Sequence, residues 1–98
     1  MKVLSRDEIE QKLGALPGWK LTAEGIQKQY KLESFLSGID LVRRVADAAE
    51  TANHHPDILI QYDQVTFTLI THDAGGITRK DFDLAARIEA LAQWGRQK

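Results

Sequence analysis

The chain has 98 residues, 43% of them hydrophobic and 28% charged, which predicts one globular domain over residues 1–98. A net charge of −1 argues against direct binding to nucleic acid, and the absence of cysteine excludes disulfides, thiolate metal sites and cysteine nucleophiles. No apolar run approaches the roughly 18 residues of a membrane span, and the opening residues lack the apolar core of a signal peptide, so we expect a cytoplasmic protein without membrane contacts.

The first elements in chain order are predicted to be a helix and a β-hairpin. Ser5 and the glutamate three residues after it have the spacing of a helical capping box, and we expect the helix to end at Pro17. Two short strands follow, over residues 19–21 and 26–32. Gly25 stands at the end of the turn between them, where a residue with positive φ is needed.

The middle of the chain predicts a long helix that begins after Ser34. Pro56 disfavours helical geometry in the residue before it, so this helix must end by about residue 54. Apolar residues recur at spacings of three and four, which predicts one buried side for the helix. The residues expected on that side are Phe35, Ile39, Val42, Ala46 and Ala49.

A second hairpin and a final helix complete the predicted fold. The strands cover residues 58–62 and 65–71, with Asp63-Gln64 as the turn between them. Thr78 and Asp81 repeat the capping-box spacing at the start of the last helix. The order α-β-β-α-β-β-α predicts an α+β fold, a four-stranded antiparallel sheet with three helices on one face.

All three histidines of the chain lie near the second hairpin. A two-residue turn at Asp63-Gln64 would place Ile60 opposite Phe67, and it would also place His55 opposite His72. Facing side chains of this kind come within roughly 5 Å at Cβ. His54 would lie beside them at the end of the long helix. We therefore expect the three imidazoles to cluster at one end of the sheet.

Residue chemistry alone leaves three interpretations of this cluster open. Each histidine could be an ordinary surface or core residue. Three imidazoles with a water molecule are also a known catalytic zinc arrangement. The third interpretation is acid–base chemistry without a metal, because histidine can take up or release a proton near neutral pH.

Several residues around the histidines carry a family resemblance. Residues 50–57 read Glu-Thr-Ala-Asn-His-His-Pro-Asp, and they are followed by Tyr62, by residues 71–73 (Thr-His-Asp) and by Asp81. This pattern resembles the signature of the pterin-4a-carbinolamine dehydratases, and the resemblance covers nearly the whole chain. It implies dehydration of 4a-hydroxytetrahydrobiopterin to quinonoid dihydropterin, which recycles the pterin cofactor of aromatic amino acid hydroxylases. It also implies that no metal or organic cofactor takes part.

The resemblance assigns expected roles to individual residues. The catalytic residues are expected to be His54, His55 and His72, with His54 and His72 as the acid–base pair and His55 mainly positioning the pterin. The expected pterin-binding residues are His54, His55, Pro56, Thr71, His72, Asp73 and Ala74. Glu50 lies one helical turn before His54, so it could orient that imidazole or remain a solvated carboxylate. Asp81 could serve catalysis or only bind the amides that begin the last helix.

The resemblance also bears on partners. It implies a homodimer or homotetramer, which agrees with the need of an open sheet to protect its edge strands. Animal members of the family additionally serve as dimerisation cofactors of a transcription factor, so a protein-interaction module is one alternative function. A histidine-metal hydrolase is the other.

Overall fold

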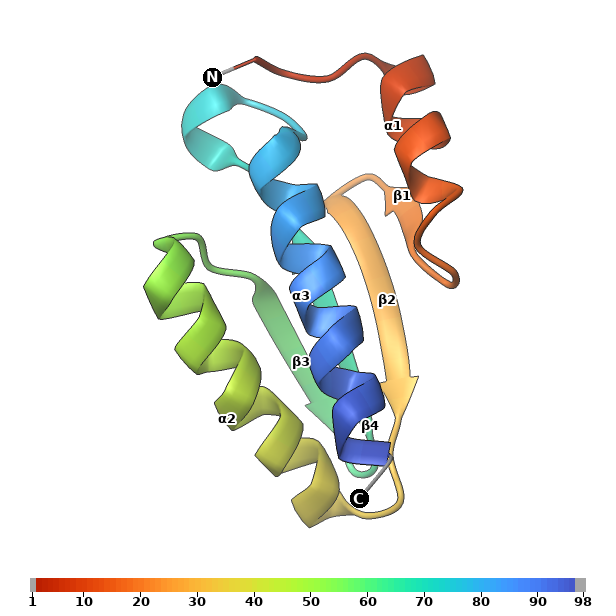
Figure 1. The fold of residues 1–98 in the computed structure, drawn as a ribbon, viewed down its shortest axis with the longest axis vertical. Helices are drawn as coiled ribbons and strands as arrows, with labels where there is room; N and C mark the ends of the chain where they lie inside the picture. Colours follow the sequence, from red (N-terminus) through yellow and green to blue (C-terminus); the bar gives the residue numbers. More distant parts are fainter. Residues whose placement is uncertain (1, 97–98) are drawn as a thin grey trace.

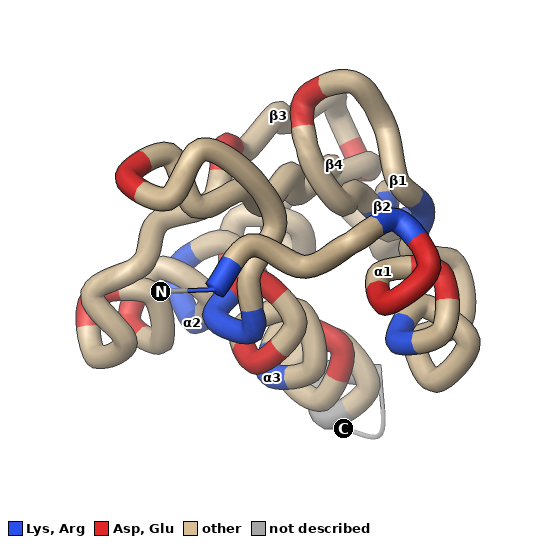
Figure 2. Tube along the Cα trace, turned by 90° about the horizontal axis from the view of Figure 1, so that it is seen from above, with Lys and Arg blue, Asp and Glu red and all other residues tan. Residues whose placement is uncertain are grey.

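Three helices cover one face of a four-stranded antiparallel sheet (Figures 1 and 2). The computed structural model describes residues 2–96. The elements are α1 (Arg6–Leu13), β1 (Lys20–Thr22), β2 (Gly25–Lys31), α2 (Phe35–Ala52), β3 (Asp57–Gln61), β4 (Gln64–Leu69), the short 3₁₀ helix η1 (His72–Ala74) and α3 (Arg79–Arg96). The strand order is β1-β2-β4-β3. The predicted α+β fold and its element order are confirmed.

Helix α1 begins with the predicted capping box. The Ser5 hydroxyl accepts a hydrogen bond from the Glu8 amide at 3.2 Å, and the Glu8 carboxylate accepts one from the Ser5 amide at 2.8 Å. This backbone bond, followed by the bond from Lys2, lowers the pKa of Glu8 to about 2. The helix ends at Leu13, earlier than the expected end at Pro17, because the next three amides each bond to the carbonyl three residues earlier and tighten the chain.

The first hairpin depends on a glycine. Gly25 has a φ of +148°, and a Cβ atom at this position would lie 2.1 Å from the carbonyl oxygen of Leu69 on the neighbouring β4. On β2, alternate side chains face the helices, and Ile26 and Tyr30 are buried there. The sheet and the two long helices enclose the hydrophobic core. None of the described helices is both long enough and apolar enough to cross a membrane.

Helix α2 has its predicted ends, but its predicted buried side is confirmed only in part: Ala49 is buried, whereas Ile39, Val42 and Ala46 are half-buried. Ser34 caps it through a bond from the Ser37 amide at 3.0 Å, and Asn53 ends it in the left-handed conformation. Phe35 is 46% exposed. The helix turns a glycine toward the sheet instead, because a Cβ atom on Gly38 would already lie 3.2 Å from the Val65 side chain. The residues of α2 that are buried are Gly38, Leu41, Val45 and Ala49.

The predicted register of the second hairpin is wrong by two residues. Ile60 pairs with Val65 and Ile58 pairs with Phe67, so the turn is Tyr62-Asp63 instead of Asp63-Gln64. A shift of two residues keeps every side chain on its original face, which is why the apolar pattern could not distinguish the two registers.

Contacts with β2 hold the turn in the observed register. The Asp63 carbonyl oxygen accepts a bond from the Leu32 amide at 2.8 Å, and the Asp63 carboxylate binds the Lys31 ammonium at 2.6 Å. Tyr62 takes a positive φ of 54° at the first turn position. Extending this register would place Ile70, and not His72, opposite His55. The predicted direct pairing of these two histidines is therefore wrong.

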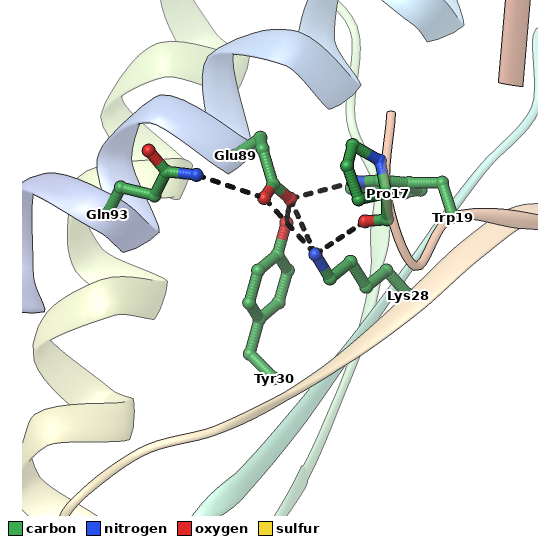
Figure 3. Close-up of polar contacts among 6 residues, drawn as sticks. All are labelled: Pro17, Trp19, Lys28, Tyr30, Glu89 and Gln93. Atoms are coloured by element: carbon green, nitrogen blue, oxygen red, sulfur yellow. Dashed lines mark hydrogen bonds and ion pairs between the residues drawn. The ribbon is translucent and has the colours of Figure 1, made fainter. Parts of the chain in front are cut away.

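A polar cluster attaches α3 to the first hairpin (Figure 3). The Glu89 carboxylate accepts bonds from the Tyr30 hydroxyl at 2.5 Å, the Lys28 ammonium at 2.9 Å and the Trp19 indole at 3.2 Å. Burial alone would raise the pKa of Glu89, but the bonds from Tyr30, Lys28 and Trp19 outweigh burial and lower it. Lys28 shares the covered face of the sheet with Ile26, and this carboxylate neutralises its charge there.

Candidate active site

One end of the molecule carries the residues predicted to act in catalysis. The end of α2, the loop to β3, η1 and the start of α3 all lie there (Figure 1). The left-handed conformation of Asn53 ends α2, and the His54 amide then bonds back to the Ala49 carbonyl at 3.1 Å. This turn directs the two neighbouring histidines to different partners.

His54 forms a buried pair with Asp81. Its Nε2 atom lies 2.6 Å from Asp81 Oδ1, and both side chains are buried. The second carboxylate oxygen, Oδ2, accepts bonds from the Thr71 hydroxyl at 2.8 Å and the Thr78 amide at 2.9 Å. Asp81 therefore both caps α3 and holds the imidazole. An ionised carboxylate only accepts, so it places the proton on Nε2 of His54 and leaves Nδ1 as the basic nitrogen.

His55 pairs with Glu50 on the surface. Its Nε2 atom lies 2.5 Å from Glu50 Oε2, and the two side chains are 57% and 77% exposed. The sequence placed Glu50 beside His54, one turn further along the same helix. Of the two possibilities for Glu50, contact with His54 is not observed, because α2 ends at Ala52 and beyond the left-handed turn His54 faces inward. Glu50 is instead an exposed carboxylate, as the second possibility held, and His55 reaches back to it.

His72 begins η1 and is exposed. Its side chain has no hydrogen bond or ion pair with the described side chains of residues 2–93. Thr71, directly before it, bonds to Asp81, which in turn bonds to His54, so the segment after β4 starts beside the buried pair. Polar contacts therefore connect His54 to the segment that carries His72, although His72 and His55 are not strand partners.

The other predicted pterin-binding residues differ in accessibility. Pro56 and Ala74 are half-buried and Asp73 is exposed, so their side chains are open to a ligand. The Thr71 side chain is buried, and its hydroxyl already bonds to Asp81 and Thr78. In the part of the chain that the structure describes, no three histidine, aspartate or glutamate side chains are grouped to hold a metal ion.

A cavity of about 590 Å³ adjoins the buried pair. It lies between α2 and α3, and His54 forms part of its wall together with Lys80, Leu84 and Arg87 of α3. The sequence prediction missed these three residues. Their spacing of four and three places them on one face of a helix, but only the packing of α3 against α2 shows that this face borders a cavity.

Comparison with known proteins identifies the family. The family model described as "Pterin 4 alpha carbinolamine dehydratase" matches residues 2–91. The chain belongs to this family. The resemblance inferred from the histidine motif is thereby confirmed at the level of the family.

Relatives in this family cover nearly the whole chain. A protein of Acidobacterium capsulatum is 50% identical over 91 residues, 93% of this chain and 99% of the relative. One of Roseiflexus sp. (strain RS-1) is 52% identical over 88 residues, 90% and 95% of the two chains. Both carry the name "Putative pterin-4-alpha-carbinolamine dehydratase".

Solved structures share the fold. The crystal structure of a transcriptional coactivator/pterin dehydratase from Brucella melitensis matches with a TM-score of 0.89 at 31% identity, covering 93% of this chain and 99% of that one. A pterin dehydratase-like protein identified as a RuBisCO assembly factor in the α-carboxysome matches with a TM-score of 0.66. At 22% identity, over 79% of this chain and 92% of that one, the second likeness concerns the fold alone.

Proposed function

We propose that this protein removes water from a 4a-hydroxytetrahydropterin and releases a quinonoid dihydropterin, acting through histidines without a metal or organic cofactor. The observation that carries the proposal is the buried pair of His54 and Asp81, which borders a cavity of about 590 Å³ in a chain of this family. Cavities that bind small molecules have volumes of about 300–1,000 Å³. In the cell, the reaction would supply the quinonoid dihydropterin that a reductase then returns to the tetrahydro form.

The reaction needs two proton transfers. The C4a–O bond breaks readily only when an acid protonates the departing hydroxyl group, which then leaves as water. The proton on N5 must also be lost, so that the electrons of the N5–H bond form the C4a=N5 double bond. Each positioned acid or base contributes roughly 10²–10⁴ in rate, and imidazole can serve as either near neutral pH.

Histidines in three different environments are available for these steps. We assign the acid–base roles to His54, which Asp81 orients, and to His72, which has no competing partner among the described side chains of residues 2–93. His55, held by Glu50 at the surface, would mainly position the pterin ring. The segments 54–56 and 71–74 would form the walls around the ring. Of these residues only His54 lines the cavity between α2 and α3, so the ring would lie at the His54 end of the cavity and extend beyond it.

Steady-state dehydration kinetics of single histidine variants test this proposal. We expect His54→Ala and His72→Ala to lose about 10²–10⁴ in rate each while circular dichroism shows an intact fold, and His55→Ala to raise KM more than it lowers kcat. Gln64→Ala, at the opposite end of the sheet, serves as the control. Near-normal rates in both His54→Ala and His72→Ala would reject the assigned roles.

Two further measurements separate the alternative functions. Activity that a chelator abolishes and zinc restores would favour a histidine-metal enzyme over the proposed dehydratase. A stoichiometric protein partner combined with absent pterin turnover would favour an interaction module.

We also propose that the chain forms a homo-oligomer through the edge strand β3. Every residue of β3 is exposed, and Leu59 at its centre is 54% exposed. Antiparallel pairing with a second copy about Leu59 would place Ile58 opposite Ile60 and the single charge, Asp57, opposite Gln61, so no like charges would meet. Sedimentation should show an oligomer for the wild type and a smaller species for Leu59→Lys. An unchanged distribution would reject β3 as the interface.

A further inference from the structure

The cavity between α2 and α3 extends along the two helices beyond the buried pair of His54 and Asp81. The two helices run antiparallel, since His54 at the end of α2 contacts Asp81 in the first turn of α3, and the Arg44 guanidinium contacts the Leu91 carbonyl at 2.9 Å (Figure 1). The cavity follows this line from His54 to Arg44. From Lys80 to Arg87, seven residues along α3, it extends about 10 Å.

Positive charge in the cavity wall lacks internal partners. Lys80 and Arg87 both line the cavity and are exposed, and neither side chain has a hydrogen bond or ion pair with the described side chains of residues 2–93. The two carboxylates in the wall already have cationic neighbours. Arg43 lies 3.7 Å from Asp47 and Arg79 lies 3.5 Å from Asp83, each pair along its own helix. The two unpaired cations are therefore available to an anionic ligand.

Apolar side chains lie beside these cations in the cavity wall. Leu84 is one turn from each of them on the same face of α3, and Ala48 contributes to the wall from α2. A carbon chain can lie against this surface while its charged end reaches a cation. Because Lys and Arg side chains are long, both cations can approach one group placed between them. A planar guanidinium suits a phosphate especially well, since it donates two parallel hydrogen bonds.

We propose that this cavity receives the C6 side chain of the pterin substrate and selects a side chain that ends in a phosphate monoester. The inference rests on the proposed function, because it places the pterin ring at the His54 end of the cavity. The carbon chain would then follow Leu84 and Ala48, and the phosphate would bind Arg87 with support from Lys80. The substrate class is thus an anionic pterin, in place of one with a neutral hydroxylated side chain.

Two substrates with the same ring and the same carbon chain test the proposal. One chain ends in a hydroxyl group and the other in its phosphate ester, and kcat and KM are measured for each. We expect a KM about tenfold lower for the phosphate ester, and we expect this advantage to fall steeply as salt is raised toward about 1 M. In Arg87→Gln the ratio of the two KM values should approach one. Arg6→Gln removes the same charge from α1 and should keep the wild-type ratio.

The outcomes distinguish this inference from the proposed function. Equal KM values for both substrates in the wild type, or an unchanged ratio in Arg87→Gln, would overturn the anionic side chain while leaving the dehydratase intact. If neither substrate is dehydrated, the proposed function fails. Calorimetric binding of two stable dihydropterins, one with and one without the phosphate, then still decides whether Arg87 recognises the anion.

Discussion

Replacing Glu89 by glutamine tests how strongly the polar cluster beneath α3 stabilises the fold. Glutamine keeps the size of the side chain but removes its charge, so the Lys28 ammonium loses its counter-ion and the Tyr30 hydroxyl loses a charged acceptor. Removing one partner of a buried ion pair costs about 3–5 kcal/mol. Because the side chains of Lys28 and Glu89 are each 17% exposed, we expect the lower end, about 3 kcal/mol. In a domain of this size that loss lowers Tm by about 12–24 °C.

Urea denaturation followed by circular dichroism measures this loss, with Glu10→Gln as the control. Glu10 belongs to the exposed pair with Arg6, where we expect a change of less than about 1 kcal/mol. The pKa of Glu89 lies below its ordinary value of 4.5, so its stabilisation is present above that pH and is lost as pH falls through the lower folded-state pKa. The gap between wild type and Glu89→Gln should therefore narrow in acid. If both variants lose the same amount at neutral pH, the reasoning is refuted.

Two further predictions concern the ends of the first elements. Gly25→Ala should lower the free energy of unfolding by about 3 kcal/mol or more, measured from the urea midpoint, because its methyl group would overlap the Leu69 carbonyl at a positive φ. Wild-type stability at this midpoint would contradict the observed turn. The pKa of Glu8 is lowered to about 2, so its stabilisation should disappear as pH falls from 4.5 toward 2. Glu8→Gln should flatten this part of the profile of Tm against pH, and an unchanged profile would contradict the lowered pKa of Glu8.

Local signals predicted the element order well, because each depends on residues close together in the chain. The capping box at Ser5 and the helix end near Asn53 require only short-range contacts, and the structure contains both. The buried side of α2 was predicted only in part, with Ala49 correct, because apolar residues occupy two sides of that helix. Only the close approach of Gly38 to Val65 decides which side faces the sheet.

The candidate site depended on contacts that a sequence does not contain. Placing the histidines at one end of the sheet required only the element order, whereas their partners depend on the turn at Asn53 and on the docking of α3. Side chains of a strand alternate between the two faces of the sheet, so a register shift of two residues leaves the apolar pattern unchanged. The predicted pairing of His55 with His72 failed for this reason. For the separate polar cluster around Glu89, the sequence does contain one signal. Lys28 on the covered face of β2 indicates a buried acidic partner, although not which one.

Asp81→Asn separates the two roles that the sequence left open for this residue, capping and catalysis. The asparagine carbonyl can still accept the bonds from the Thr78 amide and the Thr71 hydroxyl, so α3 keeps its cap. Its amide group must then face His54 Nε2, which would have to accept a hydrogen bond. The proton would move to Nδ1, and the imidazole would lose the basic nitrogen that faces away from Asp81.

We therefore expect Asp81→Asn to remain folded while its dehydration rate falls by about 10²–10⁴. Nitrogen chemical shifts of labelled histidine should show the change of tautomer at His54, which a purely structural role would not cause. Thr78→Val is the matched control, since it weakens the same network by about 1 kcal/mol and leaves the pair of His54 and Asp81 in place. A wild-type rate and an unchanged tautomer in Asp81→Asn would leave Asp81 as a helix cap alone.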